Sequence, residues 1–336
     1  MTAPGARSPA AGSPPPELVA RFKQALERLW TGPGKLGLAV SGGPDSLALL
    51  LLAEAAVPGQ FEVATVDHGL RPASAEECAL VARICAERGI SCSVLKVSVE
   101  VGNVQAEARA SRYEALLGWA NERDILAVAT AHHIDDQAET LLMRLNRGSG
   151  VSGLAGVRAW QPMGNWIPEP IRPLLQFRKS ELANLVNRAS LKAVEDPSNA
   201  DERFDRARIR QAMAENGWLN PVAIARSAQH LADADEAIEW IVRSEWTHHT
   251  DTSPGLVRYR GDRHEQGRSR RFVPREVALR LVERAIEALG GSAGRSEAAR
   301  LAQNLERGDG GNAGGVLATV EGNEWVFRRE PPRRTG

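Results

Sequence analysis

From residue 36 to residue 147, short apolar runs alternate with longer stretches whose composition favours helices. The apolar runs lie at 36–40, 61–66, 92–97 and 125–131, and the helical stretches at about 45–56, 74–88, 103–121 and 135–146. Strands that alternate with helices of this length predict βαβ units around a parallel sheet, with right-handed crossovers. The first and last runs are almost wholly apolar, as in central strands covered on both faces. The sequence therefore predicts an α/β fold.

The chain has 336 residues, which is enough for two domains. Residues 1–16 contain five prolines and a single charged residue, so we expect a disordered tail there. We expect a catalytic domain over 17–215, a helical linker over 216–250 around a long helix at 221–247, and a small α+β region over 251–336.

Further elements are predicted outside the alternating region. They are a loop with a short hairpin at 148–175, a helix at 178–189, a polar loop at 250–272, helices at 275–289 and 295–307, and a hairpin at 315–327 that turns at Glu321-Gly322-Asn323.

Charge and cysteine content limit the class of protein. Lys and Arg total 42, as do Asp and Glu, so nucleic-acid binding would have to come from local patches. The candidate arginines are Arg258, Arg260, Arg263, Arg268, Arg270, Arg271 and Arg275, and in the tail Arg328, Arg329, Arg333 and Arg334. No apolar stretch is long enough to span a membrane. Cys78, Cys85 and Cys92 show neither CxxC nor zinc-ligand spacing, which favours reduced thiols in a cytoplasmic protein.

The first predicted strand ends in a glycine-containing loop that leads directly into a helix. This loop is Ser41-Gly42-Gly43-Pro44-Asp45-Ser46. Glycine lets the backbone approach an anion closely, and the first N–H groups of the helix favour phosphate. Ser41 and Ser46 add hydroxyl donors, and Asp45 is placed to hold Mg²⁺ against phosphates. A plain glycine turn with a capping side chain is the alternative. The position between a buried strand and a helix favours phosphate binding.

Two more polar motifs follow predicted strands. Asp67 and His68 come after the second strand, and the segment His132–Thr140 comes after the fourth. Ligands of open parallel sheets bind at the carboxyl ends of the strands, so we expect these motifs to converge with the phosphate loop.

The helix that begins near His132 carries an unusual number of acids. Asp136 and Glu139 are three residues apart and share a helix face. They could form a capping box, with Asp136 as the N-cap and Glu139 at the third position. Because Asp135 adds a third carboxylate and His132 and His133 precede it, we favour a pocket that handles a cation or a proton. In the preceding helix, Gln105, Arg109 and Arg112 form one polar stripe, which is usually a solvated face.

The motifs SGGPDS, VDHGLR, NVQAEAR and HHIDDQAET, in that order, resemble those of the PP-loop ATP pyrophosphatase superfamily. In combination they are similar to the bacterial tRNA(Ile)-lysidine synthetase family. Further matches are Arg147–Gly150, Gly153–Gly156, Pro173–Leu175, Arg178-Lys179 and Asp196–Asn199. The resemblance runs from about residue 36 to residue 212. It departs from the family pattern at Ala207, where asparagine is usual, while the neighbouring arginines, Arg206, Arg208 and Arg210, match.

The resemblance implies a Rossmann-like sheet and an enzyme that uses ATP and Mg²⁺ to join free L-lysine to a cytidine of isoleucine tRNA with a CAU anticodon. It implies catalytic roles for Asp45, Arg109, His133, Asp136, Glu139 and Arg206. It also implies ATP contacts from residues 41–46, Asp67 and His68, with Asp45 as the metal ligand.

Three other functions fit the sequence less well. A tRNA thiolase on the same scaffold would need paired cysteines or an iron–sulfur cluster, and the three cysteines have no such spacing. An amidating synthetase would need a glutaminase domain with a catalytic cysteine segment. A binder without catalysis is disfavoured because Asp45, Asp136 and Glu139 are all present.

Overall fold

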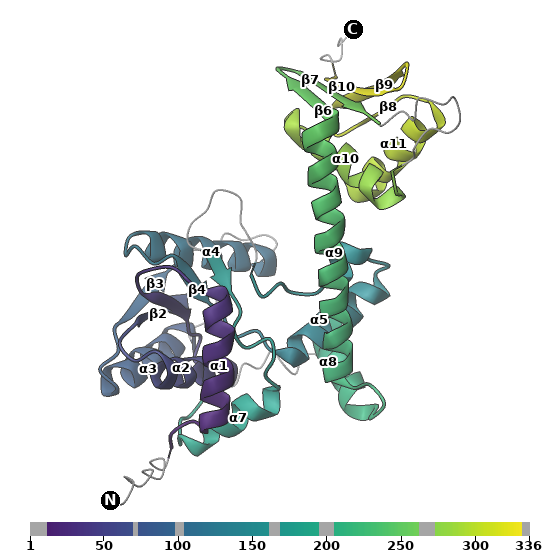
Figure 1. The fold of residues 1–336 in the computed structure, drawn as a ribbon. Coiled ribbons are helices and arrows are strands. Elements are labelled where there is room, and N and C mark those ends of the chain that lie inside the picture. The colour runs from purple at the N-terminus through teal and green to yellow at the C-terminus, as the bar shows by residue number, and fades with distance from the viewer. Residues whose placement is uncertain are drawn as a thin grey trace, which may run out of the picture. The chain divides into compact units, whose positions relative to one another are not determined.

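The computed structural model describes residues 12–69, 73–97, 104–160, 169–194, 205–261 and 273–330, with the side chains of 104–109 excepted. The chain forms two compact units, Met1–Ala232 and Asp233–Gly336 (Figure 1). The boundary falls inside helix α9, Pro221–His249, and therefore inside the expected linker at 216–250. Most of the tail expected at 1–16 lies outside the described residues, and helix α1 already begins at Pro16.

The first unit is built on a five-stranded parallel sheet in the order β3-β2-β1-β4-β5. Its strands are β1 Leu36–Ala39, β2 Phe61–Asp67, β3 Cys92–Lys96, β4 Ala127–Ala129 and β5 Glu169–Ile171. The four predicted strands and the α/β fold are confirmed. The loop with a short hairpin predicted at 148–175 is matched by an antiparallel bridge between Trp160 and Ile171, but the same stretch also forms strand β5, which pairs with β4 in parallel. This strand has three residues and contains Pro170, a residue that sheets tolerate mainly at an edge, so its sequence carries little strand signal.

Eight helices of the described chain surround this sheet or join its strands. They are α1 Pro16–Leu29, α2 Pro44–Ala56, α3 Ala73–Glu87, α4 Val104–Asn121, α5 Ile134–Asn146, α6 Val151–Leu154, α7 Lys179–Arg188 and α8 Asp205–Glu215. The predicted helices correspond to α2, α3, α4, α5 and α7. Helix α1 was not predicted, although Phe22 and Leu26, one turn apart, are buried on one of its faces.

The two faces of the sheet bury different helices. Helix α2 is buried over Ser46–Ala53, as expected for a helix that is apolar on all sides, and it packs in one core with α1 and α7. On the other face, Leu116 and Trp119 of α4 pack against the sheet. Gly37 of β1 permits this close approach, because a Cβ atom there would lie 3.0 Å from the Trp119 ring.

The order of the strands reverses at β1. The chain runs from β1 outward to β2 and β3, then crosses back to β4 on the other side of β1. In parallel α/β sheets, this reversal leaves a crevice at the carboxyl ends of the two central strands. Helices α2 and α5 follow those two strands, so both begin at this edge.

The second unit has a five-stranded antiparallel sheet in the order β6-β7-β10-β9-β8 and two helices. Its elements are β6 Thr250–Ser253, β7 Leu256–Arg260, α10 Arg275–Ala288, α11 Arg295–Arg307, β8 Gly311–Ala313, β9 Val316–Glu321 and β10 Glu324–Arg329. The two helices and the hairpin with its turn at 321–323 are confirmed. The prediction of a polar loop at 250–272 is wrong at β6 and β7. In β7, the buried Val257 and Tyr259 alternate with exposed or half-buried residues.

Several arginines expected to face RNA make contacts within this second unit. Arg329 Nε donates to the Leu289 carbonyl oxygen at 2.7 Å. Ion pairs join Arg258 to Glu324 (3.2 Å), Arg260 to Glu324 (2.8 Å) and Asp251 (3.0 Å), and Arg328 to Glu321 (2.8 Å). Cross-strand pairs of opposite charge stabilise a sheet, which explains why an arginine-rich segment forms β7. Arg263, Arg268, Arg270, Arg271, Arg333 and Arg334 lie outside the described residues.

Within the part of the chain that the structure describes, no helix combines the length and apolar character needed to cross a membrane.

Candidate active site

The phosphate loop connects β1 to α2 and is closed by Ser46. The Ser46 hydroxyl donates to the Gly43 carbonyl oxygen at 2.9 Å and accepts from the Ser41 amide at 3.2 Å. Gly43 is the N-cap of α2, and Pro44 occupies its first turn, which suits a residue without an N–H. The loop therefore presents the N-terminus of a buried helix at the sheet edge, where an anion is favoured.

Gly42 is required for the shape of this loop. Its φ of +85° lies in the left-handed region, and a Cβ atom would lie 3.0 Å from Val194 Cγ2. Its carbonyl oxygen accepts from the Val194 amide at 2.9 Å, which ties the loop to the segment after α7.

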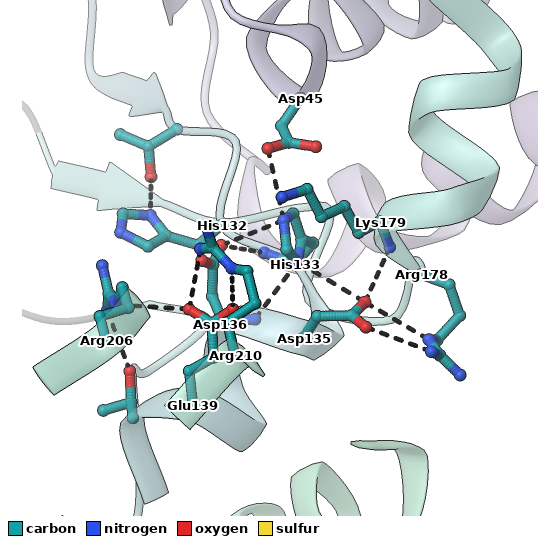
Figure 2. A network of polar contacts seen from close by, with 12 residues as sticks. Asp45, His132, His133, Asp135, Asp136, Glu139, Arg178, Lys179, Arg206 and Arg210 are labelled. Atoms are coloured by element: carbon teal, nitrogen blue, oxygen red, sulfur yellow. Dashed lines mark hydrogen bonds and ion pairs between the residues drawn. The ribbon is translucent and has the colours of Figure 1, made fainter. Parts of the chain in front are cut away.

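His133 joins the phosphate loop to the start of α5. The side chain is 2% exposed, and its Nε2 lies 3.4 Å from Oδ2 of Asp45 (Figure 2). The Asp136 amide donates to His133 Nδ1 at 3.3 Å, so a neutral ring carries its proton on Nε2, toward Asp45. Burial lowers the pKa of His133, but the hydrogen bond with Asp45 and the charges of Asp136, Asp45 and Asp135 outweigh it and raise this pKa above its ordinary value.

Helix α5 has a capping box, but not the one with Asp136 as the N-cap and Glu139 at the third position. His133 is the N-cap, and its backbone amide donates to Oδ2 of Asp136 at 3.1 Å. Asp136 therefore occupies the third position of the box rather than the N-cap, and Glu139 lies one turn further along, free of any capping role.

Glu139 is buried at 2% exposure and is held by two arginines of α8. Arg210 donates from Nε to Oε1 at 2.8 Å and from Nη2 to Oε2 at 3.1 Å, while Arg206 Nε lies 3.4 Å from Oε2. Arg206 also donates to the Thr140 hydroxyl at 3.3 Å. The hydrogen bond with Glu139 raises the pKa of Arg210 despite its partial burial. Arg210 was not selected from the sequence, although its spacing of four from Arg206 places both on one helix face.

Asp135 connects the start of α5 to the start of α7. Its Oδ2 accepts from the Lys179 amide at 2.8 Å, and its two oxygens accept from Arg178 at 3.2 and 3.3 Å. Burial raises the pKa of Asp135, but the Lys179 amide and the Arg178 guanidinium outweigh it and hold the pKa below its ordinary value.

Asp45 fits the role of a magnesium ligand. Its Oδ1 is buried and has no hydrogen-bond partner among the described residues. Among those residues there is also no group of three or more His, Cys, Asp or Glu side chains that could enclose a metal. Mg²⁺ is usually held by one or two carboxylates together with substrate phosphates and water, so a single orphaned carboxylate oxygen beside a phosphate loop suits it.

The remaining residues selected from the sequence are only partly described. Asp67 and His68 follow β2, next to β1, and hydrogen bonds from Ser74 and the Gly69 amide hold the pKa of Asp67 below its ordinary value. Arg109 belongs to α4, but its side chain lies outside the described residues. His132, at the end of β4, has its Nδ1 3.0 Å from the Thr130 hydroxyl.

Comparison with known proteins shows which family this chain resembles. A family model described as a PP-loop domain matches residues 15–216. The tRNA(Ile)-lysidine synthase of Novosphingobium aromaticivorans is 45% identical over 305 residues, which cover 90% of this chain and 91% of that protein. The corresponding protein of Zymomonas mobilis is 39% identical over 322 residues, with 93% and 94% covered.

The chain belongs to the tRNA(Ile)-lysidine synthase family of PP-loop proteins. It is therefore an ATP-binding enzyme of the ligase class that forms a carbon–nitrogen bond, as its sequence predicts.

Membership of this family agrees with the position of the cysteines. A solved U34-tRNA thiolase of Methanococcus maripaludis shares the fold, with a TM-score of 0.55, 18% identity and coverage of 65% of this chain and 78% of that one. Here, however, Cys92 is the first residue of β3, at the opposite end from the strand ends that form the site. Cys78 and Cys85 are buried in α3, and a hydrogen bond with Cys92 together with burial raises the pKa of the Cys85 thiol. Cys92 is half-buried, and none of the three thiols lies at the strand ends where sulfur transfer would take place.

Replacement of Asp135 tests the link between α5 and α7. We expect Asp135→Asn to lower the free energy of unfolding by about 2 kcal/mol at pH 7, because a charged hydrogen-bond acceptor is lost. Since the folded-state pKa is depressed, this stabilisation is present above the unfolded-state value of about 3.9 and is lost as the pH falls through the folded-state value. Thermal melts of the two proteins from pH 8 to pH 3 should therefore converge in acid.

Asp205→Asn is the matched control for this experiment. Asp205 also pairs with arginines, but it is 39% exposed. Solvent screening weakens such pairs, so its melting curve should follow the unmodified protein. A gap between Asp135→Asn and the unmodified protein that persists unchanged to pH 3 would contradict the assigned role of the carboxylate charge.

Proposed function

We propose that the chain joins L-lysine to a cytidine of tRNA and thereby forms lysidine. The observation that carries this proposal is the contact of a phosphate loop with an acidic helix start, where His133 Nε2 lies 3.4 Å from Oδ2 of Asp45. One side of this contact favours phosphate and the other favours a cation, as a reaction between ATP and an amine requires. The names of the relatives support the choice of tRNA as the substrate.

The proposed reaction has two steps. ATP first adenylates the C2 oxygen of the cytidine at the first anticodon position of isoleucine tRNA with a CAU anticodon, and pyrophosphate leaves. The ε-amine of free L-lysine then attacks C2, and AMP leaves. The modified base pairs with A rather than G, so the tRNA changes from a methionine to an isoleucine identity. The motif resemblance supports this sequence of steps.

In the first step, the phosphate loop orients ATP. The N–H groups at the start of α2 favour the phosphates, and Ser41 adds a hydroxyl. The Ser46 hydroxyl already donates within the loop, so its main contribution is to fix the loop shape. Asp45 would hold Mg²⁺, which neutralises charge on the leaving pyrophosphate when bound. His133 fixes Asp45 by placing its Nε2 proton toward the carboxylate.

In the second step, the amine must be attracted as a cation and then lose a proton. The ε-ammonium of lysine has an unperturbed pKa of about 10.4, so it arrives charged at neutral pH. Asp136 and Glu139 lie one turn apart at the start of α5. We assign proton acceptance to Asp136, because Glu139 already accepts hydrogen bonds from Arg210. Arg206, which is 45% exposed, is available to the substrate, and we keep Arg109 as a catalytic candidate on α4.

Transfer RNA is a polyanion, whereas this chain carries no net charge. Binding therefore has to come from local arginines, and each phosphate contact adds to the salt dependence of affinity. Because Arg258, Arg260 and Arg328 are paired with carboxylates, we assign this role to other basic residues of the region 251–336.

The decisive experiment is incubation with ATP, L-lysine and isoleucine tRNA, followed by mass spectrometry of the nucleosides. We expect lysidine at the first anticodon position, and pyrophosphate release that depends on tRNA because the nucleophile is a base oxygen and not water. Pyrophosphate release at the same rate without tRNA, or a product that contains sulfur, would contradict the proposal.

Replacement of Asp45 tests the first step. We expect Asp45→Asn to slow adenylation by about 10²–10³-fold, the usual effect of losing one preorganised electrostatic group. The affinity for tRNA, measured by filter binding, should not change. Glu54→Gln is the matched control, because Glu54 lies on the same helix and pairs with Arg88. If Asp45→Asn adenylates tRNA at the normal rate, Asp45 is not a magnesium ligand.

Replacement of the acids of α5 tests the second step. Asp136→Asn keeps an acceptor for the His133 amide but removes the proton acceptor, so the attack of lysine should slow by about 10²–10⁴-fold. Adenylated tRNA should accumulate in this variant and in Glu139→Gln, and high lysine concentration should partly rescue Glu139→Gln. If both variants bind tRNA but fail to form the adenylate, the two acids belong to the ATP site instead.

A further inference from the structure

We propose that Arg210 is a positioning residue for lysine, which acts by orienting the carboxylate of Glu139. This inference rests on the proposed function, because it concerns how the amine substrate is held. It goes beyond that function by assigning a role to a residue on α8, 71 positions away from the acid it orients.

The geometry of the pair is that of a fork. Arg210 donates from Nε to one oxygen of Glu139 at 2.8 Å and from Nη2 to the other at 3.1 Å. Two parallel hydrogen bonds fix the plane of the carboxylate as well as its position, which a single charge cannot do. Arg206 approaches the same carboxylate through one contact at 3.4 Å and is more exposed, at 45% against 29% for Arg210. Arg210 is therefore the residue that sets the orientation of Glu139.

The described contacts of Glu139 leave one of its acceptor positions unassigned. A carboxylate has about four acceptor positions, of which Arg210 takes two and Arg206 one. An ammonium group can take the remaining position. Because two guanidinium charges already face Glu139, its contribution to lysine binding is direction rather than net attraction. In the described part of the chain no arginine or lysine forms an ion pair with Asp136 within 4 Å, although the charge of Arg210 acts on it from further away, so we assign the attraction of the ammonium group to Asp136.

Helix α8 is attached to α5 mainly through polar contacts. None of its described side chains is buried, and Arg206 adds an ion pair with Glu139 at 3.4 Å and a hydrogen bond to the Thr140 hydroxyl at 3.3 Å. A buried carboxylate that loses its cation is costly, so the pair of Glu139 and Arg210 is the strongest attachment of α8 to α5. The role of Arg210 in orienting Glu139 must therefore be separated from a role in attaching the helix.

The test measures the two chemical steps separately in four full-length variants, Arg210→Gln, Arg210→Lys, Glu139→Gln and the double variant, with Arg208→Gln as the control on the same helix. Adenylation is followed as pyrophosphate release with ATP and tRNA. The second step is followed as lysidine formation from adenylated tRNA over a range of lysine concentrations.

We expect Arg210→Gln to raise the KM for lysine by about tenfold or more, the scale on which orienting partners act at metal sites, while adenylation changes less than about twofold. Arg210→Lys should recover only part of the loss, because an ammonium group cannot form the fork. Arg208→Gln should behave as the unmodified enzyme. The double variant should be no worse than Glu139→Gln, because a residue that acts only through Glu139 has no effect once Glu139 is gone.

Three results would overturn the inference. The first is an unchanged KM for lysine in Arg210→Gln. The second is an equal loss of rate in adenylation and in lysidine formation, and the third is additive losses of activity in the double variant. The second and third results would indicate that Arg210 only attaches α8. Failure of the proposed function is distinguishable from these, because the unmodified enzyme would then form no lysidine under the same conditions.

Discussion

The reversal of strand order between β1 and β4 determines where the chemistry of this chain is placed. Because the two central strands are parallel, α2 and α5 begin at the same edge, and both helix N-termini carry partial positive charge. The two starts differ in how that charge is used. The start of α2 is a glycine loop with no side-chain cap, so it remains open to phosphate. The start of α5 is instead capped by its own His133 and Asp136, and it carries three largely buried carboxylates, Asp135, Asp136 and Glu139. One sheet edge therefore combines an uncapped helix N-terminus with a cluster of acids.

The supporting contacts come from elements that follow the sheet in the chain. Asp135 accepts hydrogen bonds from the start of α7, and Glu139 accepts them from Arg210 of α8. The two acids on either side of Asp136 therefore bind arginines from later segments of the chain. This arrangement makes the acidic site depend on tertiary contacts across 43 to 71 residues. A local change in α7 or α8 can therefore alter the acidic start of α5 without touching the phosphate loop.

The sequence allowed the alternating core, the phosphate loop and the acidic start of α5 to be predicted, because strand ends and helix starts have local signals. It could not show that His133 is the cap of α5, since the choice between His133 and Asp136 depends on burial beside Asp45. Arg210 and Arg178 were missed as site residues for the same reason: a surface arginine and an arginine that binds a buried acid look alike in sequence. In the second unit, buried and more exposed residues alternate along β7, and this alternation is visible in the sequence. The arginines of β7 nevertheless favoured a polar loop, because the sequence does not show that they pair with a carboxylate on the neighbouring strand.

The acids of the site differ in how they are paired with basic side chains. Four carboxylates, Asp45, Asp135, Asp136 and Glu139, meet three guanidinium groups, Arg178, Arg206 and Arg210 (Figure 2). Asp135 and Glu139 form ion pairs with these arginines, whereas in the described chain Asp45 and Asp136 lie within 4 Å of His133 and feel the charge of Arg210 from further away. Two like charges that share a small space repel each other unless something separates them. The buried imidazole of His133 lies between the two carboxylates, with Nε2 3.4 Å from Asp45 Oδ2 and 3.6 Å from Asp136 Oδ2. The hydrogen bond with Asp45 and the charges of the nearby carboxylates outweigh burial and raise the pKa of His133, so the ring gains a proton more readily here than in water. In that protonated form the ring offsets the repulsion between the two carboxylates that it separates.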